Sequence, residues 1–259
     1  MKIVTFNIRI EHTTKAERIN DFVHRAGGIL MKIDKEDPDI LCFQEVTPGI
    51  GDFLLRHLPD YTLLGHEREA DDSAGYNPIA IKKGMFDVLY RRIFWLSDTP
   101  EVPGSRLPEA QARGPRVCTA LQLRRRADHK VFSVYNTHLD FVSPEVTLGM
   151  MSVVLKQLQT DQKAEAMPFF VTGDMNAPPE NPAIAYANAF ADPVLVDITR
   201  HIPVTNHDFG APLEAQSKLD YIFTDEETAK TVTEVTIWDD CHAGIYLSDH
   251  YPVSAQLQF

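Results

Sequence analysis

Polar side chains that could support hydrolytic chemistry follow apolar stretches in this sequence. When Phe169–Asn176 is read with a period of two, Asp174 and Asn176 share a face and follow apolar residues. The stretch Val131–Asp140 changes in the same way and reaches His138 near its end. Carboxylate, amide and imidazole groups gathered at strand ends could bind a metal ion, transfer protons or orient a water molecule.

Further segments repeat this change from apolar to polar: Asn7 near the start, Glu45 on the face of Leu41 and Phe43, and Asp249 with His250 before the last apolar stretch. Each alone has an ordinary explanation as a rim residue, a structural histidine or a turn. Together they are harder to explain, because burying unpaired carboxylates costs several kcal/mol unless partners or a cation compensate. Since Mg²⁺ takes oxygen ligands from carboxylates, waters and substrate phosphate, the set, completed by Asp174 and Asp220, predicts a metal-assisted hydrolase site.

Composition and charge indicate which kinds of molecule the chain can bind. The 259 residues are 44% hydrophobic and 24% charged, which is ordinary for a globular protein. The formal net charge is −12, and basic residues occur only in small groups such as 124–126. A protein that follows a nucleic-acid backbone usually has a basic face, so the charge favours a small substrate over long nucleic acid. The sequence identifies no protein partner.

The chain lacks a stretch that reads as a linker, and we expect a single domain over residues 1–259. Cys42, Cys118 and Cys241 cannot all pair with one another, and we expect buried reduced thiols. The first residues already resemble a strand rather than a secretory signal, and no apolar stretch is long enough for a transmembrane segment. We therefore expect a cytoplasmic protein.

Many short strands and few helices are expected around these polar residues. Helical patterns cover Ala16–Lys35, a segment that begins at the N-cap Ser143, and a short segment after Pro182. Because a parallel barrel needs a helix after almost every strand, mixed sheets with helices on their outer faces, an α/β sandwich, fit better. The expected strands are Lys2–Ile8, Ile40–Val46, Tyr61–Gly65, Pro78–Lys82, Phe86–Phe94, Val117–Leu123, Val131–Leu139, Pro168–Thr172, Leu219–Thr224, Thr233–Ile237 and Val253–Phe259.

Six short motifs resemble, in order, those of the endonuclease/exonuclease/phosphatase (DNase I-like) superfamily. They are TFNIR (5–9), FQEV (43–46), NTHLD (136–140), TGDMNAPP (172–179), LDYIF (219–223) and SDHYPV (248–253). The stretches 75–83, 94–105 and 115–123 look like a bacterial branch described as metal-dependent hydrolases. The resemblance implies a four-layer α/β sandwich, with two packed mixed or antiparallel β-sheets and helices on the outer faces.

The resemblance also implies a role for each residue of the site. Glu45 would be the main ligand of Mg²⁺ or Mn²⁺, with Asn7 and Asp249 nearby. Asp174 would orient or deprotonate the attacking water, although some family members assign the base to the histidine, here His250. His250 would otherwise stabilise the phosphoryl group. The remaining catalytic residues are Asp220, which would fix the ring of His250, Asn176, which would hold a phosphate oxygen or the water, and His138, as donor or leaving-group acid.

Other residues are open to two interpretations. Arg116 occupies a position where the family often has an arginine facing the phosphate, but a structural role is equally compatible. Tyr76 and Asn77 either line the substrate pocket or pack, and for Trp95 we expect packing. Met175 stands where phenylalanine is commoner and should point away from the site. The segment 106–116 has no clear family counterpart.

The resemblance and the charge together predict a divalent-metal-dependent phosphoesterase. Its substrate would be a small or lipid-like phosphodiester or phosphomonoester, such as a lipid headgroup ester, attacked by activated water. The alternative is a DNA or RNA nuclease of the same fold, which the net charge of −12 disfavours. A non-catalytic binding protein that retains the fold is disfavoured too, because the motif residues are all chemically competent.

Overall fold

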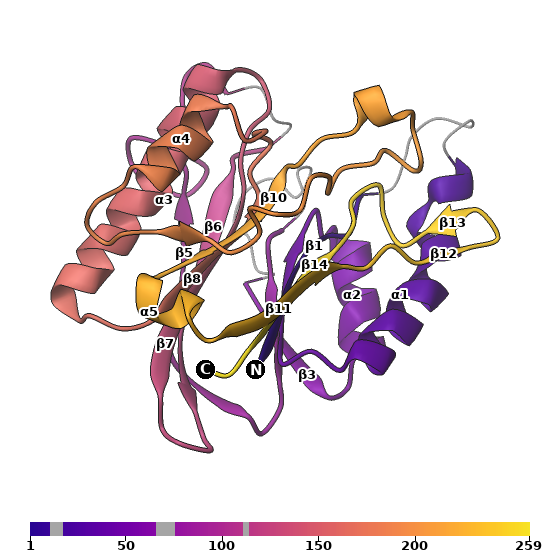
Figure 1. Ribbon diagram of the computed structural model, residues 1–259, viewed down its shortest axis with the longest axis horizontal. Helices are drawn as coiled ribbons and strands as arrows, with labels where there is room; N and C mark the ends of the chain where they lie inside the picture. The colour runs from indigo at the N-terminus through magenta and orange to yellow at the C-terminus, as the bar shows by residue number, and fades with distance from the viewer. Residues whose placement is uncertain (11–17, 66–75, 111–113) are drawn as a thin grey trace.

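The computed structural model describes residues 1–10, 18–65, 76–110 and 114–259. Two six-stranded sheets pack face to face, and helices cover the outer face of each (Figure 1). Three apolar cores separate these four layers. The α/β sandwich expected from the sequence is therefore confirmed.

The first sheet has the order β11-β14-β1-β2-β4-β3, and helices α1 and α2 cover it. β1 lies at its centre, parallel to β2 and antiparallel to β14. The elements on this side are β1 (Lys2–Asn7), β2 (Ile40–Gln44), β3 (Tyr61–Leu64), β4 (Ile79–Lys82), β11 (Val232–Ile237), β14 (Val253–Leu257), η1 (Arg18–Asn20), α1 (Phe22–Glu36) and α2 (Pro48–His57). A hairpin of β12 (Cys241–His242) and β13 (Ile245–Tyr246) follows β11.

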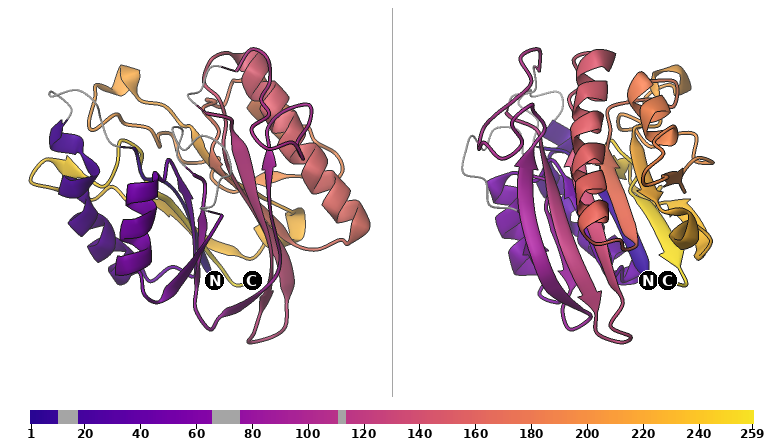
Figure 2. Two further views of the ribbon diagram at one scale, coloured as in Figure 1. Left: turned by 180° about the vertical axis from the view of Figure 1, so that it is seen from behind. Right: turned by 90° about the vertical axis from the view of Figure 1, so that its left-hand side faces the viewer.

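The second sheet has the order β5-β6-β7-β8-β10-β9, and Figure 2 shows α3 lying across its outer face. β7 and β8 run parallel, and β10 returns antiparallel to β8. The elements on this side are β5 (Phe86–Trp95), β6 (Val117–Arg125), β7 (Val131–His138), β8 (Phe169–Asp174), β9 (Val196–Asp197), β10 (Asp220–Thr224), α3 (Pro144–Ala164) and α4 (Pro182–Asn188). In the chain, η3 (Leu213–Ala215) lies between β9 and β10, and α5 (Glu226–Ala229) lies between β10 and β11.

The strand faces explain where the polar residues gather. Phe132 and Phe170 belong to the core between the sheets, so His138 and Asp174, which share their alternation, also point between the sheets. Ile3 belongs to the same core, and Asn7 follows it by alternation. The inner faces of both sheets are thus apolar through most of their length and polar at one end.

The close approach of β7 and β8 depends on Gly173. Its φ is +146°, and a Cβ atom at this position would lie 2.0 Å from the carbonyl oxygen of Thr137. Met175, two residues further, is fully buried in the core beneath α3 and α4, as expected from alternation. The glycine and the methionine together fix the end of β8, which carries Asp174.

The helices differ more from expectation than the strands do. The helix expected over Ala16–Lys35 begins at Phe22, and its expected start at 16–17 lies outside the described residues. Ile19 and Val23 are apolar residues of this expected helical range, but both are exposed. Helix α2 was not expected, because Gly49 and Gly51 weaken a helical pattern of ten residues.

Further expectations concern the cysteines and the membrane. Cys42 and Cys118 are buried free thiols, as expected, whereas Cys241 is a free thiol but exposed. Within the described ranges, no helix combines the length and apolar character needed to cross a membrane.

Candidate active site

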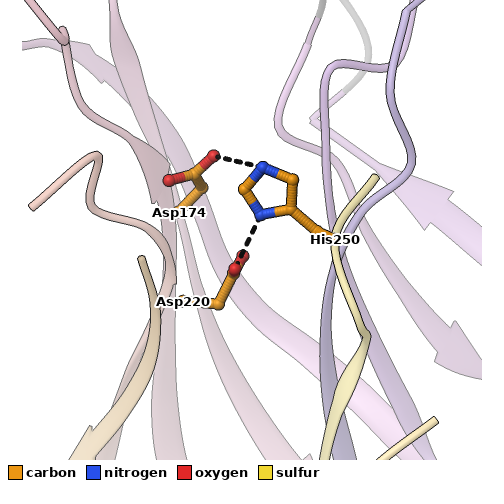
Figure 3. A group of neighbouring side chains, drawn as sticks. All are labelled: Asp174, Asp220 and His250. Atoms are coloured by element: carbon orange, nitrogen blue, oxygen red, sulfur yellow. Dashed lines mark hydrogen bonds and ion pairs between the residues drawn. The ribbon is translucent and has the colours of Figure 1, made fainter. Parts of the chain in front are cut away.

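His250 lies between two buried carboxylates (Figure 3). Its Nδ1 is 2.7 Å from Oδ2 of Asp220, and its Nε2 is 3.7 Å from Oδ2 of Asp174. Burial lowers the pKa of His250, but the facing carboxylates of Asp220 and Asp174 outweigh burial and hold that pKa well above the ordinary 6.5. We call these three residues the histidine cluster.

Strand register creates the histidine cluster. Asp174 is the last residue of β8, Asp220 is the first of β10, and the two are directly paired in the antiparallel register. Burial, together with the nearby Asp220, raises the pKa of Asp174 to about 6, although His250 opposes the shift. A carboxyl group that titrates near neutrality can accept a proton from water and release it again.

His138 and Asn176 adjoin the histidine cluster. His138 pairs with Asp174 in the parallel register of β7 and β8, and its Nε2 lies 3.4 Å from Oδ2 of Asp174. The side-chain nitrogen of Asn176 is 2.9 Å from the same Nε2. Asn176 has a φ of +46°, and its backbone N–H donates to Oδ1 of Asp174 over 2.9 Å. The turn after β8 therefore brings Asp174 and Asn176 together beside His138.

Asn7 connects this group to the first sheet. Its side-chain N–H₂ donates to Oδ2 of Asp174 over 2.9 Å and to Oε1 of Glu45 over 3.1 Å. Glu45 follows β2 with a φ of +61°, which redirects its side chain. The expected shared face of Glu45 with Leu41 and Phe43 is therefore wrong, because those two residues pack beneath α1 and α2.

Glu45 and Asp249 lie around the guanidinium of Arg9, and we call these three residues the arginine cluster. Nε of Arg9 is 3.2 Å from Oδ2 of Asp249, and its Nη1 is 4.0 Å from Oε1 of Glu45. Burial raises the pKa of Asp249, but His250, Arg9 and a hydrogen bond from Ser248 together hold it below its ordinary value. Glu45 also accepts the backbone N–H of Ile10 over 2.9 Å.

Two sets of residues have donor atoms suited to a metal ion. Glu45, Asn7 and Asp249 offer only oxygen donors, the type that hard cations such as Mg²⁺ and Mn²⁺ prefer. The three residues of the histidine cluster also bring one donor atom each within 4.8 Å of one another. In that cluster, however, one of the three donors is an imidazole nitrogen of His250, which suits a hard cation less well than oxygen does. The donor chemistry of the first set fits a hard divalent cation better.

Arg116 is buried close to the carboxylates of the site. Burial lowers the pKa of its guanidinium, while Glu45, Asp140 and Asp174 raise it. Within the described residues its Nε has no hydrogen-bond partner. A buried cation with unused donor capacity beside three carboxylates is suited to an anionic group such as a phosphate.

Tyr76 and Asn77 both contact backbone groups of neighbouring segments. The backbone of Tyr76 pairs with Val46, the residue after Glu45. The side chain of Asn77 donates to the carbonyl of Val117 over 2.9 Å. Both residues are buried, and these contacts are of the packing kind; their expected role in the substrate pocket stays a prediction.

Three residues near the site were not among the expected set. The side-chain nitrogen of Asn206 is 2.8 Å from Nε2 of His250, and nothing in its sequence context indicates this contact. Arg9 belongs to the TFNIR motif, so its position after Asn7 could have suggested it. Arg25 lies in a helical pattern, where an arginine is expected to be solvated, but it is only 1% exposed.

A four-layer sandwich that gathers carboxylates, amides and histidines at one end of its inner faces is the architecture of the DNase I-like hydrolases. The chain belongs to the Endonuclease/Exonuclease/phosphatase family, whose family model matches residues 4–250. Members of this family are phosphoester hydrolases and generally use divalent metals. The resemblance found in the sequence motifs is thereby confirmed.

Solved structures agree with this assignment. An endonuclease/exonuclease/phosphatase from Bacteroides vulgatus is 26% identical, with 99% of this chain and 98% of that chain covered and a TM-score of 0.88. A mannosyl-6-phosphatase from Bacteroides thetaiotaomicron is 22% identical over the full length of both chains, with a TM-score of 0.85. D. rerio TDP2, solved with a single-strand DNA product, is 17% identical, with 98% and 97% covered and a TM-score of 0.72.

A curated sequence is related as well. An uncharacterized protein of Acanthamoeba polyphaga mimivirus is 24% identical over 190 residues, which are 68% of this chain and 67% of that protein. The structural neighbours below 25% identity share the fold and differ in what they act on.

Proposed function

We propose that this protein is a divalent-metal-dependent phosphoesterase that hydrolyses a small or lipid-like phosphodiester or phosphomonoester by attack of activated water. The observation that carries the proposal is the pairing of Asp174 and His250, 3.7 Å apart and both with raised pKa values. Groups with such perturbed pKa values in one site are typical of proton transfer during catalysis.

We assign the general base to Asp174. Asp220 and Asp174 hold the pKa of His250 well above 6.5 and so favour its protonated form, which cannot accept another proton. Asp174, with a pKa of about 6, is largely ionised at neutral pH and basic enough to take a proton from a water molecule. Asn7 and the backbone N–H of Asn176 keep its two oxygens oriented.

The other residues act on the phosphoryl group. Protonated His250 donates to a phosphoryl oxygen as negative charge develops there, and Asp220 keeps its ring in place. Asn176 donates to another oxygen or to the attacking water. His138, which is 3.4 Å from Asp174, delivers a proton to the leaving oxygen. Arg116 compensates the charge of the bound phosphate.

Glu45, Asn7 and Asp249 are the residues that would hold Mg²⁺ or Mn²⁺. When bound, such a cation supplies Lewis-acid stabilisation of the charge on the phosphoryl oxygens. Because both sheets contribute to the site, we also propose that residues 1–259 act as one domain. A cytoplasmic location stays a prediction from the sequence.

The preference for a small substrate rests on the net charge of −12. The similarity to a mannosyl-6-phosphatase is compatible with a phosphomonoester of small size. The similarity to a DNA-bound TDP2 keeps a nuclease as the alternative. Cleavage of duplex plasmid at physiological salt, at a rate above that of small phosphoesters, would reverse the ranking.

The test is turnover of p-nitrophenyl phosphate, bis(p-nitrophenyl) phosphate and a panel of phosphosugars, nucleotides and lipid headgroup esters, with Mg²⁺ or Mn²⁺ and with EDTA. We expect turnover that EDTA abolishes and that Asp174→Asn removes. Asp34→Asn, an exposed carboxylate of α1, is the matched control and should retain full activity. The absence of metal-dependent turnover across the panel would contradict the proposal.

A further inference from the structure

Arg25, on α1, makes unusual contacts for an arginine of a helix. Its guanidinium is buried and donates to the backbone carbonyls of four residues. The donor–acceptor distances are 2.7 Å to Ile8, 2.7 Å to Leu247, 3.0 Å to Arg9 and 2.6 Å to Asn20. A planar guanidinium has the fixed fork of donors that such a fan of carbonyls requires.

Two of these carbonyls belong to the turn that follows Asn7. Arg9 has a φ of +60°, in the left-handed region that a side-chain-bearing residue adopts only when its surroundings hold it there. The opposite edge of the turn points at the site, because the N–H of Arg9 donates to Oδ1 of Asn7 and the N–H of Ile10 donates to Oε2 of Glu45. Arg25 thus fixes the turn from behind, and the turn orients Asn7 and Glu45.

The carbonyl of Leu247 belongs to the segment that carries Asp249. The same nitrogen, Nη1, binds Leu247 and Ile8. One group of Arg25 therefore holds together the chain before Asp249 and the chain after Asn7, and the two residues that it contacts, Ile8 and Leu247, are 239 positions apart in sequence. Figure 1 shows α1 beside the β12–β13 hairpin that leads into this segment.

We propose that Arg25 is a positioning residue for the cation site, which sets the spacing between Glu45, Asn7 and Asp249 through the backbone. This inference rests on the proposed function, since it concerns the same metal site. A purely electrostatic role of Arg25 would have the opposite effect on metal affinity. The positive charge of Arg25 interacts with Asp249 and Glu45, and such a charge would repel a metal cation bound there. Positioning strengthens metal binding, whereas charge alone weakens it.

The test is the dissociation constant of Mn²⁺, measured by isothermal titration calorimetry on the full chain. Arg25→Lys keeps the charge and loses the fork, and Arg25→Gln loses both. We expect both variants to bind Mn²⁺ about 10- to 100-fold more weakly, the range found when groups that orient metal ligands are lost. Ile33→Ala, also buried on α1, is the control: it should lower the melting temperature and leave Mn²⁺ binding unchanged.

Folded Arg25→Lys with wild-type Mn²⁺ affinity, or Arg25→Gln with tighter binding, would overturn the inference. If neither variant folds, hydrogen exchange of the wild-type protein decides. Mn²⁺ should then slow exchange in residues 21–26 together with 8–10 and 247–250, and unchanged exchange in 21–26 overturns the inference. If the wild-type protein binds Mn²⁺ but hydrolyses no phosphoester, only the proposed function is contradicted. If it does not bind Mn²⁺, both the proposed function and the inference on Arg25 are contradicted.

Discussion

The histidine cluster and the arginine cluster solve the same physical problem in different ways. Each cluster buries carboxylates, and in each the negative charge is compensated by a basic side chain from a distant segment, His250 in one and Arg9 in the other. In the histidine cluster the positively charged group is the imidazole of His250, which can lose its proton, and the pKa of Asp174 is raised to about 6. In the arginine cluster the positively charged group is the guanidinium of Arg9, which keeps its charge, and the pKa of Asp249 is lowered.

This difference separates two tasks. Groups whose pKa values lie near neutrality can move protons, whereas permanently ionised groups hold charge at all working pH values. Asn7 bonds to both Asp174 and Glu45, so the two clusters meet at one amide. We therefore expect substitutions in the histidine cluster to change turnover and substitutions in the arginine cluster to change metal binding.

Asp174→Asn should have the largest effect. The amide keeps the shape of the carboxylate but cannot accept the proton of the water, so kcat should fall on the order of 1,000-fold or more. Mn²⁺ binding should stay within about threefold of wild type, because Asp174 lies outside the arginine cluster. Steady-state kinetics and titration calorimetry on the same preparation check both parts, and a large loss of Mn²⁺ affinity would break the separation.

Glu45→Gln should come next, with the opposite pattern. Loss of the carboxylate should weaken Mn²⁺ binding on the order of 100-fold, because hard cations depend on charged oxygen ligands. Turnover should recover in part as Mn²⁺ is raised, since the histidine cluster is intact. Titration of activity against Mn²⁺ concentration measures this, and loss of turnover that no Mn²⁺ concentration relieves would count against the assignment.

Asp220→Asn should reduce kcat by about 10- to 100-fold, the usual cost of removing the group that orients a functional histidine. It should also move the alkaline limb of the pH–rate profile to lower pH. Asp220 raises the pKa of His250, and His250 acts in its protonated form, so activity is lost as pH rises through that pKa. An alkaline limb at the wild-type position would show that His250 does not act as the donor.

The smallest of these effects should be the loss of wild-type activity on the acid side of the pH–rate profile. Because Asp174 must be ionised to act as the base and its pKa is about 6, kcat/KM should fall about tenfold per pH unit below 6. Asp34→Asn should give the same profile. A limb near the ordinary carboxyl pKa of 3.8 would mean that burial does not control the base.

The sequence predicts well the strands and the gathering of polar residues at one end of the sheets, because alternation along a strand determines which residues share a face. His138, Asp174 and the buried Met175 follow this rule. It fails where the backbone leaves the strand, as at Glu45 with its φ of +61°. Residues in loops or helices, such as Asn206 and Arg25, make contacts with segments distant in sequence, Asn206 with His250 and Arg25 with Leu247, which a local pattern cannot indicate.

The position of a bound Mn²⁺ tests the division between the clusters most directly. Anomalous scattering from a crystal grown with Mn²⁺ would locate the ion without reliance on activity. We predict a peak beside Glu45, Asn7 and Asp249, with His250 still bonded to Asp220. A single peak among Asp174, Asp220 and His250, the other group with suitable donor atoms, would contradict the account.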